Sequence, residues 1–149
     1  MHELIKKFLA LVGEGDSGKT SAIEDLVKDT NGFKLTGNSQ ISFCSINGAP
    51  ILTINSSPQE RNRSKVNDQI DADLEKLEEI AAIFNLNYFV VLMPFTTNVN
   101  TDANEEKIRI DGAIAHIKNN KGYEFDRIDK KAYDGLKLFN TLKAHRFFI

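Results

Sequence analysis

The chain has 149 residues, of which 41% are hydrophobic and 27% are charged, and its formal net charge is −2. These values are typical of one globular domain spanning residues 1–149, and the slightly negative charge gives no signal of nucleic-acid binding. The single cysteine, Cys44, excludes an internal disulfide. Because the N-terminus lacks a signal-peptide pattern and no apolar run is long enough to cross a bilayer, we expect a cytoplasmic protein without a membrane partner.

The first predicted strand, at about residues 8–12, leads into the strongest signal in the chain. Residues 13–20 read Gly-Glu-Gly-Asp-Ser-Gly-Lys-Thr, and a predicted helix follows from about residue 18 to residue 29. Strand, glycine-rich loop, Lys-Thr and helix together form the P-loop, or Walker A, pattern. Its glycines let backbone N–H groups converge on phosphate oxygens. The predicted nucleotide-binding residues are Gly13, Glu14, Gly15, Asp16, Ser17, Gly18, Lys19, Thr20 and Ser21.

Two side chains of this loop have predicted chemical roles. Lys19, which we expect to be exposed when no ligand is bound, should contact the β- and γ-phosphates and stabilise charge during phosphoryl transfer. The hydroxyl of Thr20 should bind Mg²⁺, the expected cofactor. The glycines at 13, 15 and 18 also fit a dinucleotide-binding loop, which requires an acid about 20 residues further on. Residues 33–38 offer no acid, and this alternative leaves Lys19 and Thr20 unexplained.

A β-hairpin is predicted over about residues 40–55, after a loop at 33–39. Two apolar segments flank Asn47-Gly48, which favours a two-residue turn with both central residues at positive φ. With this turn, Phe43 lies opposite Leu52 and Ile41 lies opposite Ile54.

The remainder of the chain alternates between helices, strands and polar loops. The predicted elements are a polar loop over 55–63, a helix over 66–84, a buried strand over 88–93 ended by Pro94, a polar loop over 96–104, helices over 103–118 and 127–144, and an edge strand over 145–149. We therefore expect an α/β fold with the three layers of a P-loop NTPase and a mainly parallel sheet that includes the antiparallel hairpin. The loops at 13–20, 55–63 and 96–104 should meet at one edge of that sheet, where ligands bind.

Strand, P-loop, helix, hairpin and polar loop follow one another over residues 8–60. This order resembles the front half of a small GTPase, a family in which the third strand ends in Asp-x-x-Gly and Gln-Glu follows in the Ras-like branch. Gln59 and Glu60 match the Gln-Glu pair, whereas Asn55 replaces the Asp and Pro58 replaces the Gly. The resemblance implies that Gln59 or Glu60 orients water and that Asn55 lies beside the metal; the alternative is a solvated loop. The Asn-Lys-x-Asp motif for guanine is missing.

Three functions remain open from the sequence. The first is binding and hydrolysis of ATP or GTP by a switch that an unidentified protein partner regulates; without the guanine motif, ATP is favoured. The second is a small phosphotransferase of the nucleotide-kinase type, with Arg109 or Arg127 as lid arginines, although the usual acid after the third strand is absent. The third is a nucleotide-binding protein with little turnover, because no apolar strand ends in the acid that normally supports Mg²⁺.

Overall fold

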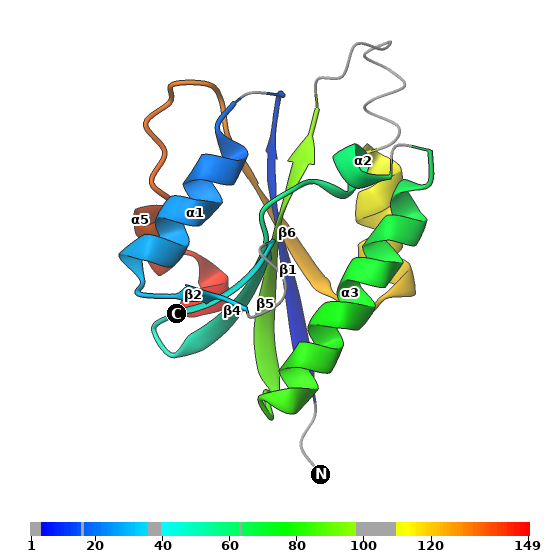
Figure 1. Ribbon diagram of the computed structural model, residues 1–149, viewed down its shortest axis with the longest axis horizontal. Helices are drawn as coiled ribbons and strands as arrows, with labels where there is room; N and C mark the ends of the chain where they lie inside the picture. The colour runs from blue at the N-terminus through cyan, green and yellow to red at the C-terminus, as the bar shows by residue number, and fades with distance from the viewer. Residues whose placement is uncertain (1–3, 16, 36–39, 63, 98–109) are drawn as a thin grey trace.

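Two apolar strands at the centre of the sheet organise the fold. β1 (Ile5–Gly13) and β5 (Tyr88–Thr96) run parallel along their whole length. Both strands are buried from their middle to their carboxyl ends, as expected for strands covered on both faces. Their carboxyl ends lie together at the upper edge of the molecule in Figure 1.

The computed structural model describes residues 4–15, 17–35, 40–62, 64–97 and 110–149. In these residues the other elements are α1 (Lys19–Asp29), β2 (Phe33–Lys34), β3 (Ile41–Ile46), β4 (Ala49–Ile54), α2 (Pro58–Arg61), α3 (Val66–Ile83), a helix over 110–115 that continues as a π-helical turn (His116–Asn120), β6 (Glu124–Asp129), α5 (Leu138–Lys143) and a 3₁₀ turn (Arg146–Phe148). The described strands form one mixed sheet in the order β2-β3-β4-β5-β1-β6. β4, β5, β1 and β6 are parallel, and β3 is antiparallel to both of its neighbours. The fold is therefore α/β.

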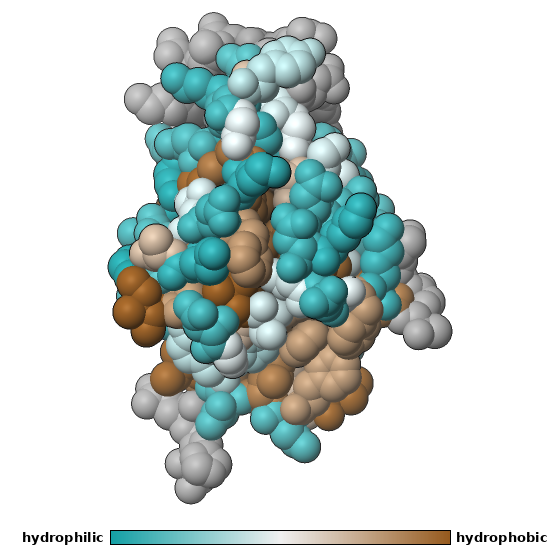
Figure 2. Space-filling model, turned by 90° about the vertical axis from the view of Figure 1, so that its left-hand side faces the viewer, coloured by the Kyte–Doolittle hydropathy of each residue, from teal (hydrophilic) through white to brown (hydrophobic). Residues whose placement is uncertain are grey.

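Helices cover both faces of the sheet (Figure 1). Alternate residues of a strand point to opposite faces, so Phe89 and Val91 pack against the α3 side while Val90 and Leu92 pack against the α1 side. α5 lies beside α1, and the 110–120 helix lies beside α3. Figure 2 shows the side of α1 and α5, where hydrophilic side chains cover much of the surface. None of the helices in the described ranges is long and apolar enough to cross a membrane.

The local predictions for the hairpin and the two long helices are confirmed. Ile41 pairs with Ile54 and Phe43 pairs with Leu52, as the turn at Asn47-Gly48 required. Both turn residues have positive φ, 52° for Asn47 and 81° for Gly48. α1 and α3 occupy the predicted ranges within one residue.

Pro94 does not end the buried strand, contrary to the prediction. β5 continues through Pro94 to Thr96 and stays paired with β1. The ladder between β5 and β4 ends at Leu92, so at Pro94 the strand has no β4 residue opposite it. A residue that lacks an N–H is tolerated at such a local edge.

The predicted helix over 127–144 is wrong. Its first residues belong to β6, in which Phe125 packs on the α3 face and Ile128 on the α1 face. Tyr133 and Gly135 have positive φ, which a helix does not accommodate, and α5 begins only at Leu138.

Three smaller predictions are corrected as well. The C-terminal edge strand is a 3₁₀ turn, and the loops over 33–39 and 55–63 contain the short β2 and α2. For the helix over 103–118, residues 110–118 are helical and the part before residue 110 lies outside the described residues. Only the first two residues of the predicted loop over 96–104 are described, and Thr96 belongs to β5.

Candidate functional site

The glycine-rich loop joins β1 to α1 at the carboxyl edge of the sheet. Gly18 is the N-cap residue of α1 and has a φ of 89°. Residues with a Cβ atom rarely adopt such a positive φ. At Gly13, a Cβ atom would lie 2.3 Å from the backbone oxygen of Lys130. Glycine is therefore required at position 18 by backbone conformation and at position 13 by close packing. Asp16 lies outside the described residues.

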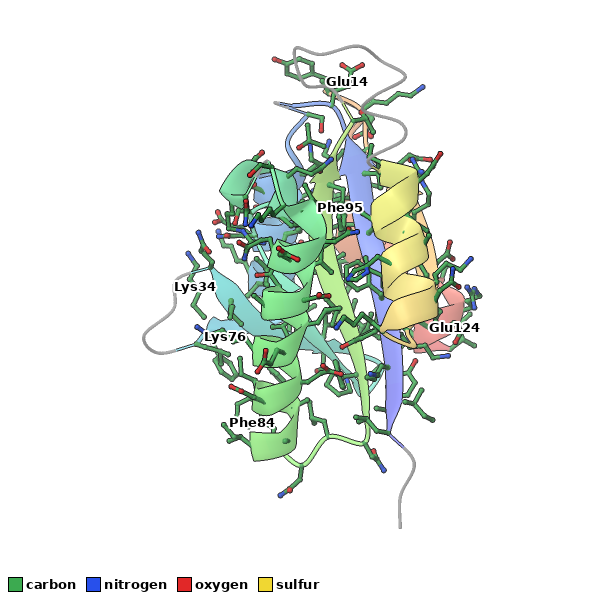
Figure 3. All side chains as sticks on the ribbon, turned by 90° about the vertical axis from the view of Figure 1, so that its right-hand side faces the viewer. Glu14, Lys34, Lys76, Phe84, Phe95 and Glu124 are labelled. Carbon is green, nitrogen blue, oxygen red and sulfur yellow. The ribbon has the colours of Figure 1, made fainter. Side chains whose placement is uncertain are left out.

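Glu14 and Gly15, in the first half of the loop, are both exposed. The backbone oxygen of Glu14 accepts a hydrogen bond from the N–H of Ser17 at 3.2 Å, which closes a turn. Figure 3 shows Glu14 at the end of the molecule opposite to Phe84, which follows α3. The exposed side chain of Glu14 borders a cavity together with Lys130 and Lys131, so charges of both signs lie at this rim.

Lys19 is buried, contrary to the expectation that it would be exposed; its exposed fraction is 7%. Its Nζ atom donates to the backbone oxygens of Gly13 at 3.0 Å and Glu14 at 2.6 Å, and lies 3.4 Å from Oγ of Ser17. The ammonium group is thus folded back into its own loop. The loop oxygens compensate part of the desolvation that burial of a charge imposes.

The start of α1 forms a further part of the site. No side chain in the described residues caps this end, and its first turn contains no acidic residue. The first N–H groups of a helix have no partner within the helix, and the helix dipole places partial positive charge there. This end of α1 can therefore accept an anion.

Thr20 and Asn55 lie together, as the sequence pattern required. The hydroxyl of Thr20 donates to the backbone oxygen of Asn55 at 2.8 Å. Because this bond uses the hydroxyl proton, lone pairs of the Thr20 oxygen remain for another ligand. The side chain of Asn55 donates to Oε1 of Glu24 on α1 at 3.2 Å.

Gln59 and Glu60 are adjacent in α2 but have different surroundings. Gln59 is buried, and its amide is paired with the backbone of Thr96. Glu60 is exposed, and its side chain borders the same cavity as Lys19 and Thr20. Of these two residues, only Glu60 is exposed and borders the cavity beside the glycine-rich loop.

Two of the cavities that border the glycine-rich loop meet at the start of α1. The α2 cavity has a volume of about 290 Å³ and is lined by Ser17, Gly18, Lys19, Thr20, Ser21, Ser57, Glu60 and Pro94. The β6-loop cavity has a volume of about 280 Å³ and is lined by Ser17, Gly18, Ser21, Ala22, Asp25, Lys130, Ala132, Tyr133, Gly135 and Leu136. Both share Ser17, Gly18 and Ser21, so an elongated ligand centred on these residues could extend into each.

No protein-family model, curated protein or solved structure matches this chain. The chemistry of the site therefore has to be inferred from its own residues and their geometry.

The segment over 130–136 is a part of the site that the sequence pattern did not identify. The N–H of Lys130 donates to the backbone oxygen of Val12 at 2.7 Å, which joins this segment to β1 just before the glycine-rich loop. The carboxylate of Asp134 accepts from the N–H groups of Leu136 and Lys131 and from Nζ of Lys130. These bonds, led by those from Leu136 and Lys131, lower the pKa of Asp134 to about 2. The sequence feature that could have identified this segment is the turn dipeptide Asp134-Gly135, which lies inside the helix predicted over 127–144.

The described residues provide few metal ligands. No group of three or more His, Cys, Asp or Glu side chains among them could hold an ion. The Thr20 hydroxyl oxygen is available, Glu60 borders the same cavity, and Glu24 bonds to Asn55. This set fits Mg²⁺ held mostly by phosphate oxygens and water, which Mg²⁺ tolerates because it dehydrates reluctantly.

Proposed function

We propose that this chain is a P-loop NTPase-type domain, with the three-layer fold of that superfamily, which binds a nucleoside triphosphate and hydrolyses it slowly. The observation that carries the proposal is the start of α1, which no described side chain caps and where Lys19 and Thr20 border the α2 cavity. Backbone donors, a buried ammonium and a hydroxyl with free lone pairs converge there. These groups match a polyphosphate with its Mg²⁺.

The shape of the site supports a nucleotide rather than free phosphate. The two cavities share the residues at the start of α1, so a triphosphate in the α2 cavity would leave the nucleoside in the β6-loop cavity. Tyr133 is fully exposed at that cavity, and its ring is free to stack on a base. Since no guanine motif is present, ATP is the proposed ligand and GTP the competitor to be tested.

Binding requires Lys19 to change partners. Its Nζ now bonds to Gly13 and Glu14, and a phosphate oxygen offers a stronger, charge-assisted acceptor. Thr20 keeps its bond to Asn55 and presents its oxygen to Mg²⁺, which, when bound, neutralises charge on the phosphates. Glu60 is the proposed residue that orients the attacking water, because both polar atoms of the Gln59 amide are paired with Thr96.

A nucleotide-binding protein with little turnover is the second candidate. It is favoured because the Gln59 amide is bonded to the backbone of Thr96, so that of the Gln59-Glu60 pair only the exposed Glu60 is left to orient water. The nucleotide-kinase alternative is less favoured because Arg127, one of its two candidate lid arginines, is paired with Asp129 on β6. The other, Arg109, lies outside the described residues. A protein partner that raises the rate is compatible with both candidates.

The test is a thermal-shift and calorimetric screen of ATP, GTP and ADP, each with Mg²⁺ and with a chelator, together with measurement of phosphate release. We expect ATP with Mg²⁺ to raise the melting temperature most. Lys19→Ala should weaken ATP binding by more than tenfold, about 1.4 kcal/mol. Lys28→Ala, which changes an exposed lysine on the same helix, is the matched control. Absence of any shift with all three nucleotides would overturn the proposal.

A further inference from the structure

Ser57 is a buried hydroxyl in the wall of the α2 cavity. Its exposed fraction is 1%, and it borders this cavity together with Lys19 and Thr20. No sequence motif pointed to Ser57, because the Gln-Glu pair that follows was the stronger resemblance. Its position opposite the start of α1 is therefore a result of the fold alone.

The hydrogen bonding of Ser57 leaves its proton available. Oγ accepts the N–H of Glu60 at 3.1 Å, which caps α2. A hydroxyl can accept two bonds and donate one. Among the hydrogen bonds of the described residues, the Ser57 hydroxyl accepts this one and donates none. Because the hydroxyl proton rotates about the C–O bond, it can be directed to a ligand in the cavity without loss of the cap.

The residue that follows Ser57 cannot supply a backbone donor. The next residue is Pro58, which has no N–H. The side chain of Glu60 in the same wall is an acceptor when ionised and repels phosphate. Among the side chains of Ser57, Glu60 and Pro94 on this side of the cavity, the Ser57 hydroxyl is thus the hydrogen-bond donor.

Ser57 is also held in a fixed position. The guanidinium of Arg61 forms two bonds of 2.7 Å to the carboxylate of Asp73 on α3. At the other side of α2, Gln59 is bonded to the end of β5. A donor on such a fixed support loses little entropy when it binds.

We propose that the Ser57 hydroxyl donates a hydrogen bond to the terminal phosphate of a bound nucleoside triphosphate and thereby distinguishes the triphosphate from the diphosphate. This inference rests on the proposed function, since it requires phosphates at the start of α1. A diphosphate bound to the loop has no terminal group that extends to the α2 wall. The affinity for the triphosphate alone should therefore depend on Ser57.

The experiment compares the binding of ATP, a non-hydrolysable ATP analogue and ADP to Ser57 variants by calorimetry. Ser57→Ala should weaken both triphosphates about tenfold, as expected for loss of a hydrogen bond to a charged group, and should leave ADP affinity within about twofold. Ser57→Thr keeps the cap and the donor and should behave as the wild type. Ser57→Asp keeps a cap acceptor but has no donor, so α2 should stay folded while triphosphate affinity falls further.

The outcomes separate this inference from the proposed function. If the wild type binds neither ATP nor ADP, the proposed function is wrong, and so is the proposed role of Ser57. If the wild type binds both but Ser57→Ala and Ser57→Asp leave the ATP-to-ADP affinity ratio unchanged, only the role of Ser57 is wrong. An equal loss of ATP and ADP affinity in Ser57→Ala would show that Ser57 acts only as a helix cap.

Discussion

The side-chain amide of Gln59 is paired at both of its polar atoms with the backbone of Thr96. Oε1 accepts the N–H of Thr96 at 2.6 Å, and Nε2 donates to its oxygen at 2.9 Å. The ladder between β4 and β5 has already ended at Leu92, so this amide takes the place of a neighbouring strand at the end of β5. Gln59 joins α2 to the sheet.

Gln59→Ala should therefore destabilise the protein. It would leave the buried N–H and oxygen of Thr96 without these partners, and we expect the free energy of unfolding to fall by about 3 kcal/mol. Urea denaturation measures this change. Gln69→Ala is the control, since Gln69 is half-buried and its side-chain amide donates a hydrogen bond to Asp73. If Gln59→Ala abolished nucleotide hydrolysis with no change in unfolding, Gln59 would orient water instead.

Gly13→Ala should be poorly tolerated. The new Cβ atom would lie 2.3 Å from the backbone oxygen of Lys130 and 2.7 Å from Oγ of Ser17. Backbone must shift to relieve this overlap, at a cost of about 2 kcal/mol in folding free energy. Gly112→Ala is the control: nothing lies within 4 Å of its Cβ position in a helix, so it should stabilise by about 0.5 kcal/mol. Equal midpoints of thermal unfolding for the two variants would contradict the close packing at Gly13.

Asn55→Asp should make nucleotide binding more dependent on Mg²⁺. The new carboxylate would replace an amide that bonds to Glu24 at 3.2 Å, and the two negative charges would repel without a cation. We expect about tenfold tighter ATP binding in Mg²⁺ and weaker binding in chelator. Titration of ATP under both conditions measures this.

The control is Glu24→Gln, alone and combined with Asn55→Asp. Removal of the Glu24 charge should restore ATP binding in chelator while the gain in Mg²⁺ remains. If Asn55→Asp weakened binding equally with and without the metal, residue 55 would not lie beside it.

The segment over 130–136 should loosen only in strong acid. The pKa of the Asp134 carboxyl is lowered to about 2 by its bonds to Leu136, Lys131 and Lys130. Because the pKa is lower in the folded state, the carboxylate stabilises the segment at any pH above the pKa of the unfolded chain, which is about 4. This contribution is lost as the pH falls through about 2. An NMR titration of the Asp134 carboxyl carbon should give a midpoint near 2. Asp134→Ala should differ from the wild type at pH 5 and converge with it below pH 2; a midpoint near 4 would mean that these bonds are absent.

Local signals in the sequence were sufficient for several elements. Asn47-Gly48 determines the hairpin register, because only a two-residue turn brings Ile41 opposite Ile54. The apolar stripe over residues 66–84 predicted the helix that the structure has at Val66–Ile83. The proximity of Thr20 to Asn55 followed from the strand–loop–helix order at a common edge of the sheet.

The remaining features depend on contacts between distant parts of the chain. β6 has apolar residues on both faces, so its spacing imitates a helix until the pairing with β1 is known. The partners of Lys19 are backbone oxygens, which no residue pattern encodes. The bonds from Gln59 to Thr96 join two segments whose proximity depends on β5 lying beside β4.

The position of β1 between β5 and β6 has a consequence for synthesis in the cell. β1 is synthesised before the other described strands, but the two strands that pair with it follow more than 70 residues later. Contacts between such distant segments form late, because a long loop must close before they are gained. The glycine-rich loop acquires its shape only after Lys130 has bonded to Val12. A ligand bound there would thus mark a chain in which β6 has already paired with β1, because the loop that holds the ligand depends on that pairing.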